Sequence, residues 1–218
     1  MNISWLGHSC FKIETKYQNQ NLVIITDPYH KEIGLRVPKM AADIVTISHE
    51  HDDHNNREAV EGNLEKTPFL IDQPGEYEIK GVFVHGLSSS HDNQDGAQRG
   101  GNIIYRFDIE GLSLVHLGDL GHQLSDQQLD QLGNVDVLFV PVGGTYTLDA
   151  NGASKLVREI EPRLVIPMHY RDDKVKLKLD SVNAFRKEMG GQATTEKKIK
   201  IAAKNLPAEE TKIIILEK

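Results

Sequence analysis

Short apolar runs, each bounded by turn-forming residues, recur along the whole chain and predict β-strands. Strands are expected over 3–6, 10–13, 22–26, 42–47, 68–71, 77–79, 82–86, 102–109, 112–117, 135–142, 163–167, 197–202 and 212–216. Helical patterns cover 125–132, 150–160 and 181–189; the polar segment 55–64 is compatible with a helix, and 30–40 is expected to be a surface loop. Helices that fall between the later strands predict two sheets with helices outside them.

The densest chemistry in the chain lies in residues 48–54, directly after the apolar run 42–47. In an extended segment, residues two apart point to the same side, so His49 and His51 can bind one metal ion together. After a turn, Asp53 and His54 can face a second ion. Imidazole and carboxylate suit zinc, manganese or iron(II). The alternative is a solvated polar turn, and a dinuclear site would need further ligands at other strand ends.

Other predicted strands also end in residues that bind metals. Asp27 follows the strand 22–26, His91 lies at the exit of a strand into a glycine-rich loop, and glycines flank Asp119. His169 follows the strand 163–167. We therefore expect these side chains to gather with residues 49–54 at one edge of the two sheets.

Composition narrows the class of protein. The chain of 218 residues fits a single domain, 1–218, and its net charge of −7 disfavours non-specific binding to nucleic acid. Cys10 is the one cysteine, which excludes an intrachain disulfide and is compatible with a reducing cytosol. Residues 1–6 do not have the pattern of a signal peptide, and no apolar run reaches the length that spans a membrane, so we expect neither feature. We expect a cytoplasmic protein.

The run from His49 to His54 has the pattern H-x-H-x-D-H, and His91, Asp119 and His169 follow it in order. In these motifs the whole chain resembles the metallo-β-lactamase-fold hydrolases. The stretches 5–9, 74–77, 143–149 and 166–169 resemble the branch of small zinc-dependent hydrolases that includes L-ascorbate-6-phosphate lactonase. The resemblance implies an α+β fold, a four-layer αββα sandwich.

The resemblance also implies a ligand set for two divalent ions, zinc first, with manganese or iron as alternatives. His49, His51 and His91 would hold one ion, Asp53, His54 and His169 the other, and Asp119 would bridge them. A bridging hydroxide would attack an ester, lactone or phosphoester, and Asp53 and Asp119 would take part in catalysis. Because the ions carry more positive charge than their ligands remove, a small anionic metabolite is the expected substrate.

Further residues near these motifs are candidates for supporting roles, each with a simpler alternative. His8, Asp27 and Glu76 could orient metal ligands through hydrogen bonds, or could be residues of local turns. The remaining candidates could contact substrate, the arginines through a phosphate or carboxylate, or could be packing and surface residues; they are Arg99, Tyr146, Thr147, Tyr170 and Arg171. His85 and His116 lie within predicted strands and are interpreted as structural.

Three other functions compete with a hydrolase of small metabolites. A nuclease or phosphodiesterase could use the same site, but its relatives add an RNA-clamping domain, and the acidic charge disfavours it. A di-iron redox protein would carry glutamate at the position of His51. A non-catalytic protein would not need a complete ligand set. The expected partner is thus a small-molecule substrate, with no membrane, and a homo-oligomer is compatible with the sequence.

Overall fold

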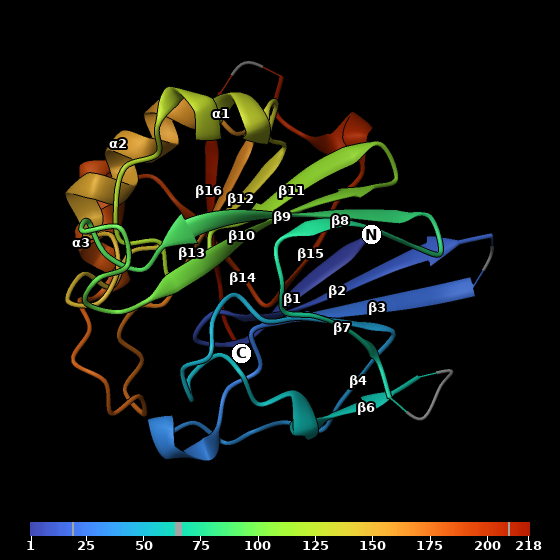
Figure 1. Ribbon diagram of the computed structural model, residues 1–218. Coiled ribbons are helices and arrows are strands. Elements are labelled where there is room, and N and C mark those ends of the chain that lie inside the picture. The colour runs from blue at the N-terminus through green and yellow to red at the C-terminus, as the bar shows by residue number, and fades with distance from the viewer. Residues whose placement is uncertain (19, 64–66, 209) are drawn as a thin grey trace.

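The computed structural model describes residues 1–218 except 19, 64–66 and 209, and two β-sheets pack face to face in it (Figure 1). The six-stranded sheet has the order β15 (Lys198–Lys200), β1 (Asn2–Gly7), β2 (Cys10–Tyr17), β3 (Gln20–Thr26), β5 (Ile44–Thr46) and β7 (Phe69–Ile71). Its inner face contributes buried residues such as Ile3, Phe11 and Ile13 to the main core.

The eight-stranded sheet supplies the other half of that core. Its order is β14 (Thr194–Glu196), β16 (Lys212–Leu216), β13 (Leu164–Met168), β12 (Val137–Pro141), β11 (Leu112–His116), β10 (Gly101–Ile109), β9 (Val82–Ser90) and β8 (Gly75–Ile79). Strands β11, β12 and β13 are parallel and buried throughout, because one face meets the other sheet and the other face meets helices. Their continuous apolar sequences follow from burial on both faces.

Three α-helices in the described residues lie beside the eight-stranded sheet, on the side away from the six-stranded one (Figure 1). They are α1 (Asp126–Leu132), α2 (Ala150–Ile160) and α3 (Val182–Glu188). The side chains of Ser125, Asp149 and Ser181 each accept a hydrogen bond from a backbone N–H of the first turn that they cap. None of the helices in the described ranges is long and apolar enough to cross a membrane.

The outer face of the six-stranded sheet was expected to carry a layer of α-helices, but in the described residues other elements cover it. Two 3-10 turns, η1 (Lys31–Ile33) and η2 (Arg57–Ala59), and a small parallel sheet of β4 (Met40–Ala42) and β6 (Val60–Gly62) lie there. The segment 55–63, which was compatible with a helix, forms η2 and β6 instead, and residue 64 lies outside the described residues. The segment 30–40 is largely a loop, as expected, but it contains η1 and leads into β4. Ile33, Leu35 and Met40 are buried in a second apolar cluster, because this segment shields the sheet from water.

The predicted strand 42–47 is divided at Asp43. The Asp43 carboxylate accepts a hydrogen bond of 2.9 Å from the backbone N–H of Val23, and β4 turns away to pair with β6. β9 continues to Ser90, beyond its predicted end at 86, because β10 pairs with it along its whole length. The α+β class and the two packed sheets were predicted correctly. The single-domain assignment of 1–218 stays a prediction.

Candidate metal centre

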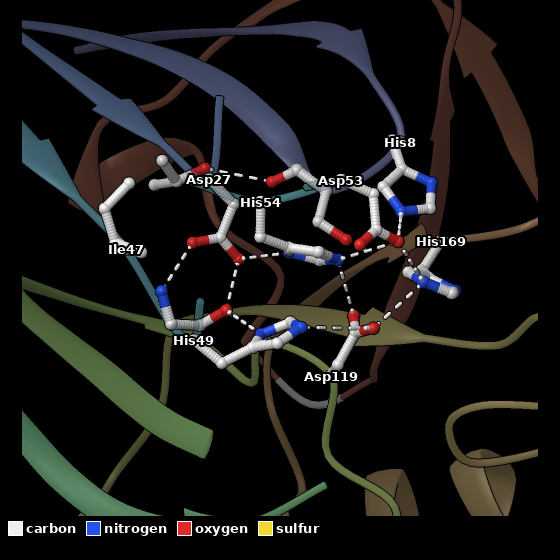
Figure 2. Close-up of polar contacts among 12 residues, drawn as sticks. His8, Asp27, Ile47, His49, Asp53, His54, Asp119 and His169 are labelled. Atoms are coloured by element: carbon white, nitrogen blue, oxygen red, sulfur yellow. Dashed lines mark hydrogen bonds and ion pairs between the residues drawn. The ribbon is translucent and has the colours of Figure 1, made fainter. Parts of the chain in front are cut away.

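Strands from both sheets end at one edge of the sandwich and place histidines and aspartates there. Asp27 follows β3, residues 49–54 follow β5, His91 follows β9, Asp119 follows β11 and His169 follows β13. His8 lies in the turn after β1 and reaches the same place. The close-up in Figure 2 shows several of these side chains pointing toward one another from separate strands.

Taking one nitrogen or oxygen atom from each residue, two groups have all these atoms within 4.8 Å of one another, and a third group of the same kind, His49, His54 and Asp119, shares a histidine with each of them. One group consists of His49, His51 and His91. The other consists of His8, Asp53, His54 and His169. These are the two triads predicted from the sequence, with His8 added to the second.

Asp119 lies between the two groups. Its Oδ2 is 3.3 Å from His91 Nε2 and 3.0 Å from His169 Nε2. Its Oδ1 is 3.2 Å from His54 Nε2, a contact drawn in Figure 2. A single buried carboxylate therefore touches histidines of both groups.

Several polar atoms at the centre are buried without a hydrogen-bond partner among the described residues. They are His49 Nε2, His54 Nε2, His91 Nδ1, Asp119 Oδ1 and both ring nitrogens of His169. A buried polar atom without a partner is costly unless something satisfies it. Imidazole nitrogen and carboxylate oxygen are the atoms that bind zinc, manganese and iron(II). The residues therefore fit divalent cations.

The histidines of the centre differ in charge because their neighbours differ. Burial opposes the charged form of His169, but Asp119 and Asp53 outweigh it and raise its pKa to about 9. Burial likewise opposes a raised pKa at His54, and Asp119 with Asp53 still moves that pKa well above its usual value. Burial and repulsion from His54 lower the pKa of His49 to about 3. Without metal, protons on His54 and His169 balance the buried carboxylates.

Asp27 holds candidate ligands in position through hydrogen bonds, on the side of the rings away from their Nε2 atoms. Its Oδ2 accepts a hydrogen bond of 2.9 Å from His54 Nδ1 and one of 2.6 Å from the Ser48 hydroxyl. Its Oδ1 accepts one of 2.7 Å from the Ser48 backbone N–H. Ser48 Oγ, whose proton goes to Asp27, accepts a hydrogen bond of 3.0 Å from His49 Nδ1. Both Nδ1 atoms are thus occupied, which leaves both Nε2 atoms for metal.

The sequence did not lead us to predict Ser48 as a residue of the site, although it directly precedes His49. Asn102 was missed as well: its Oδ1 accepts a hydrogen bond of 2.9 Å from the backbone N–H of Asp119, and its amide donates one of 2.9 Å to Leu117 O. The sequence could have indicated the role of Ser48, because its hydroxyl group directly precedes the first candidate ligand. No such indication exists in the sequence for Asn102, which lies on β10, 17 residues before Asp119.

Backbone conformations at the centre are unusual. His8, Asp27 and His169 have φ angles of 56°, 39° and 51°, in the left-handed region that non-glycine residues seldom occupy. Such conformations persist where surrounding contacts hold them, and they are frequent at functional sites. Gly118 has φ 57°, and a Cβ there would lie 2.3 Å from Asn102 Oδ1. Only glycine fits between Asn102 and Asp119.

His8 lies beside Asp53, as expected for a residue that orients a ligand. His8 Nε2 is 3.0 Å from Asp53 Oδ2, and the ring centroid is 4.1 Å from that of His169. Burial, with repulsion from His169, lowers the pKa of His8 to about 4, so the ring is neutral and Nε2–H donates to the carboxylate. This contact fixes one oxygen of Asp53.

The structure does not bring every predicted residue to the centre. Glu76 lies on β8 with its side chain 86 % exposed, 3.9 Å from His85, so the role suggested for it was wrong. Tyr170 stacks on Trp5 with centroids 5.2 Å apart, and Arg171 is an exposed residue. Tyr170 is buried against Trp5 while His169 faces the centre, and the left-handed backbone at His169 lies where the chain changes direction between them.

His116 and His85 lie within strands, as expected. His116 is buried in β11, and its Nε2 donates a hydrogen bond of 2.9 Å to Ser9 O in the turn between β1 and β2. His85 is partly exposed on β9, 3.6 Å from Asp108. Thr147 Oγ1 is 3.3 Å from Leu148 O, which gives that hydroxyl a local partner.

A groove with a volume of about 540 Å³ adjoins His49 and His51. Arg99 lies at this groove, and its guanidinium donates hydrogen bonds of 3.1 Å to Tyr146 O and 3.0 Å to Thr145 O. Volumes of this order hold small molecules. Of the residues predicted to contact substrate, Arg99 has the clearest position beside the metal-binding side chains.

Comparisons with known proteins agree with this geometry. Residues 2–169 match the family described as the beta-lactamase superfamily domain. A UPF0173 metal-dependent hydrolase of Thermoplasma acidophilum is 25% identical, covering 78% of this chain and 83% of its own. One of Listeria innocua is 30% identical, covering 78% of this chain and 85% of its own.

Solved structures show the same architecture. A metallo-beta-lactamase superfamily structure from Thermotoga maritima superposes with a TM-score of 0.78 at 33% identity, covering 99% of this chain and 97% of the other. A TM-score of this size over nearly the whole of both chains means that the sheets and helices have the same arrangement in the two proteins.

Proposed function

The chain belongs to the metallo-beta-lactamase superfamily, and from this premise we propose that it is a hydrolase of small molecules working with two divalent metal ions. That it is a metal-dependent hydrolase follows from its relatives, which are named so. The number of ions and the class of substrate are the proposal.

His49, His51 and His91 would hold one ion, and Asp53, His54 and His169 the other. The observation that supports the binding of two metal ions is the position of Asp119. Its Oδ2 lies 3.3 Å from His91 Nε2 and 3.0 Å from His169 Nε2. A carboxylate between two groups of ligands is suited to contact both ions. Zinc is the leading candidate, with manganese and iron as alternatives, because all three accept histidine and carboxylate.

Bound metal would lower the pKa of a water molecule and polarise the carbonyl or phosphoryl oxygen of the substrate. The surrounding residues would orient the histidine ligands and accept a proton. Asp27 and Ser48 hold His54 and His49 in the tautomers that present Nε2. Burial opposes ionisation of Asp53, but His54, His169 and His8 lower its pKa below the usual value. Asp53 is therefore ionised, and we assign it the proton that the attacking water loses.

The substrate would be an ester, lactone or phosphoester of a small anionic metabolite. Two divalent ions bring four positive charges, and Asp53 with Asp119 removes two, so the centre attracts negative charge. The groove beside His49 and His51, about 540 Å³, has the size of a small-molecule site. The net charge of −7 opposes binding to a nucleic-acid backbone.

Metal analysis of single-ligand variants tests the two-metal arrangement. Wild type should bind two ions per chain, and His51→Ala and His169→Ala should each lose one while keeping the other. His85→Ala is a matched control on β9, away from the centre, and should keep both. One ion in wild type, or a full complement in a double variant His49→Ala, Asp119→Ala, would overturn the assignment.

A substrate panel tests the reaction. Lactones, carboxylic esters, phosphomonoesters, phosphodiesters and RNA would be offered to the protein loaded with zinc, manganese or iron in turn. Turnover of a lactone, ester or phosphomonoester that the His51→Ala variant loses would support the proposal. Cleavage of RNA without turnover of any small ester or lactone would overturn it.

A further inference from the structure

The groove beside the metal centre has one positively charged side chain in its lining, that of Arg99. Its other residues include His49, His51, Pro74, Ser88 and Gly100. A Cβ placed on Gly100 would meet no atom within 4 Å, so the groove is open at this point. A molecule in the groove would therefore touch the metal-binding histidines and Arg99 together.

The backbone that carries Arg99 is held in place by Asp92. This buried carboxylate accepts four hydrogen bonds, from the N–H groups of residues 94, 96, 98 and 99, at distances of 2.8 to 3.0 Å. Asp92 directly follows His91, so the segment that supplies a metal-binding histidine also fixes the Cα of Arg99.

The tip of the Arg99 side chain is held as well. Nη1 and Nη2 donate to Tyr146 O and Thr145 O, and the guanidinium carbon lies 5.4 Å from the centroid of the Tyr146 ring. These contacts use two of the five N–H donors of the guanidinium, and the acceptors are neutral carbonyls. The side chain is thus ordered before any ligand arrives, which reduces the entropy cost of binding.

The charge of Arg99 is not neutralised by a neighbour. No carboxylate of the described ranges lies within 4.0 Å of its guanidinium, and the carboxylate that shares the groove, Glu50, pairs with Arg57 and accepts a hydrogen bond from Asn55. A fixed, unpaired guanidinium binds planar anions through paired N–H donors.

We propose that Arg99 is the specificity residue of this hydrolase, binding a carboxylate or phosphate of the substrate while the scissile group lies at the metal centre. This inference rests on the proposed function. It narrows the substrate to molecules with an anionic group at some distance from the bond that is hydrolysed. Arg171, the other candidate arginine, is exposed and has no place in this groove.

Binding of simple acids to the zinc-loaded protein tests this without requiring turnover. The probes are the dicarboxylates malonate, succinate, glutarate and adipate, each paired in that order with its one-charge counterpart acetate, propionate, butyrate or pentanoate, and binding is measured by calorimetry. The monocarboxylates report the metal centre alone. In wild type, at least one chain length of dicarboxylate should bind roughly tenfold or more tighter than its counterpart, because a second charge-assisted contact forms. 3-Phosphonopropionate shows whether a phosphonate is preferred to the second carboxylate.

Two substitutions of Arg99 and one of Arg171 as a control decide the outcome. Arg99→Gln should abolish the preference for dicarboxylates and leave monocarboxylate affinity unchanged, while Arg99→Lys, which keeps the charge and guards against a folding defect, should retain part of it. Arg171→Gln should behave as wild type. A preference that survives in Arg99→Gln, or its absence from wild type at every length, would overturn the inference. Failure of the proposed function would show separately, as missing zinc or missing turnover.

Discussion

His54 Nδ1 donates a hydrogen bond of 2.9 Å to Asp27 Oδ2, and both side chains are fully buried. Asp27 comes from the end of β3, and His54 from the turn after β5. The bond fixes the tautomer and the ring plane of His54, so that Nε2 faces Asp119 at 3.2 Å. Removal of such outer partners of metal-binding histidines typically costs 10–100-fold in metal affinity.

Asp27→Asn should therefore weaken one metal ion more than the other. Both Asp27 oxygens accept hydrogen bonds from N–H donors, His54 Nδ1 and the Ser48 backbone, whereas an amide has one acceptor oxygen, so one donor would face an NH2 group. We expect affinity at the ion held by His54 to fall by roughly 10–100-fold. Competition with a chelator of known affinity measures this. The matched control is Asp43→Asn, another carboxylate with low exposure that accepts a backbone N–H and lies away from the centre. Equal metal affinity in the two variants would contradict the assigned role.

Ser48→Ala should affect the other ion. His49 Nδ1 loses its acceptor at 3.0 Å, while the bond between Asp27 and His54 remains. We expect a loss of roughly tenfold or more at the ion held by His49 and little change at the other. Cobalt(II) spectra, titrated one equivalent at a time, distinguish the two. Ser154→Ala removes a buried hydroxyl in α2 and should leave both ions unaffected.

His8 should act through Asp53. His8→Ala removes the donor at 3.0 Å from Asp53 Oδ2, whereas His8→Gln can place an amide N–H near the same position. We expect metal affinity to fall in the alanine variant and to recover in part with glutamine. Chelator competition is again the measurement, with Glu76→Gln as the control because that side chain is exposed. Similar losses in both His8 variants would mean that packing, rather than the hydrogen bond, is what His8 provides.

Gly118→Ala should destabilise the protein more than Gly111→Ala. Both glycines have positive φ, 57° and 74°, but a Cβ at 118 would meet Asn102 Oδ1 at 2.3 Å, whereas one at 111 would meet nothing within 4 Å. The backbone term alone costs about 1 kcal/mol. Displacing Asn102 should raise the total at 118 to about 3 kcal/mol, measured by urea unfolding without metal. Equal losses would show that the space beside Asp119 is larger than the structure indicates.

The stability of the metal-free protein should pass through a maximum near pH 6.5. The pKa of His169 rises to about 9 despite burial, because of Asp119 and Asp53, so its contribution is complete below the unfolded pKa near 6.5 and is lost up to pH 9. Burial lowers the pKa of His8 to about 4, so stability also falls as pH drops from 6.5.

Urea unfolding of chelator-treated protein between pH 4 and 9 measures this maximum. His169→Asn should reduce the alkaline loss, leaving the part that comes from the raised pKa of His54, and should keep the acidic loss. Metal affinity should rise with pH over the same alkaline range, because the ion competes with the proton on His169. An affinity that is independent of pH between 6.5 and 8.5 would contradict the protonation assigned to this histidine.

The sequence by itself determined the family, most strands and the residues that supply the centre. The histidines and aspartates of the centre are residue types that are typical of metal sites, and several of them stand at or shortly after the end of a predicted strand, so residue type and position together predicted them. The helices 150–160 and 181–189 were predictable from a capping residue and an apolar face.

Only the tertiary structure decided what surrounds these residues. The amide of Asn102 and the guanidinium of Arg99 obtain their partners from other strands and loops, and no local pattern indicates such contacts. Ser48 stands beside His49 in the sequence, but its hydroxyl meets Asp27 only in the folded protein. Glu76 is excluded from the centre for the same reason, since the pairing of β8 with β9 turns its side chain to solvent beside His85. Metal-binding residues are marked by their own chemistry, whereas the residues that orient them, and the space that admits a substrate, depend on how the two sheets come together.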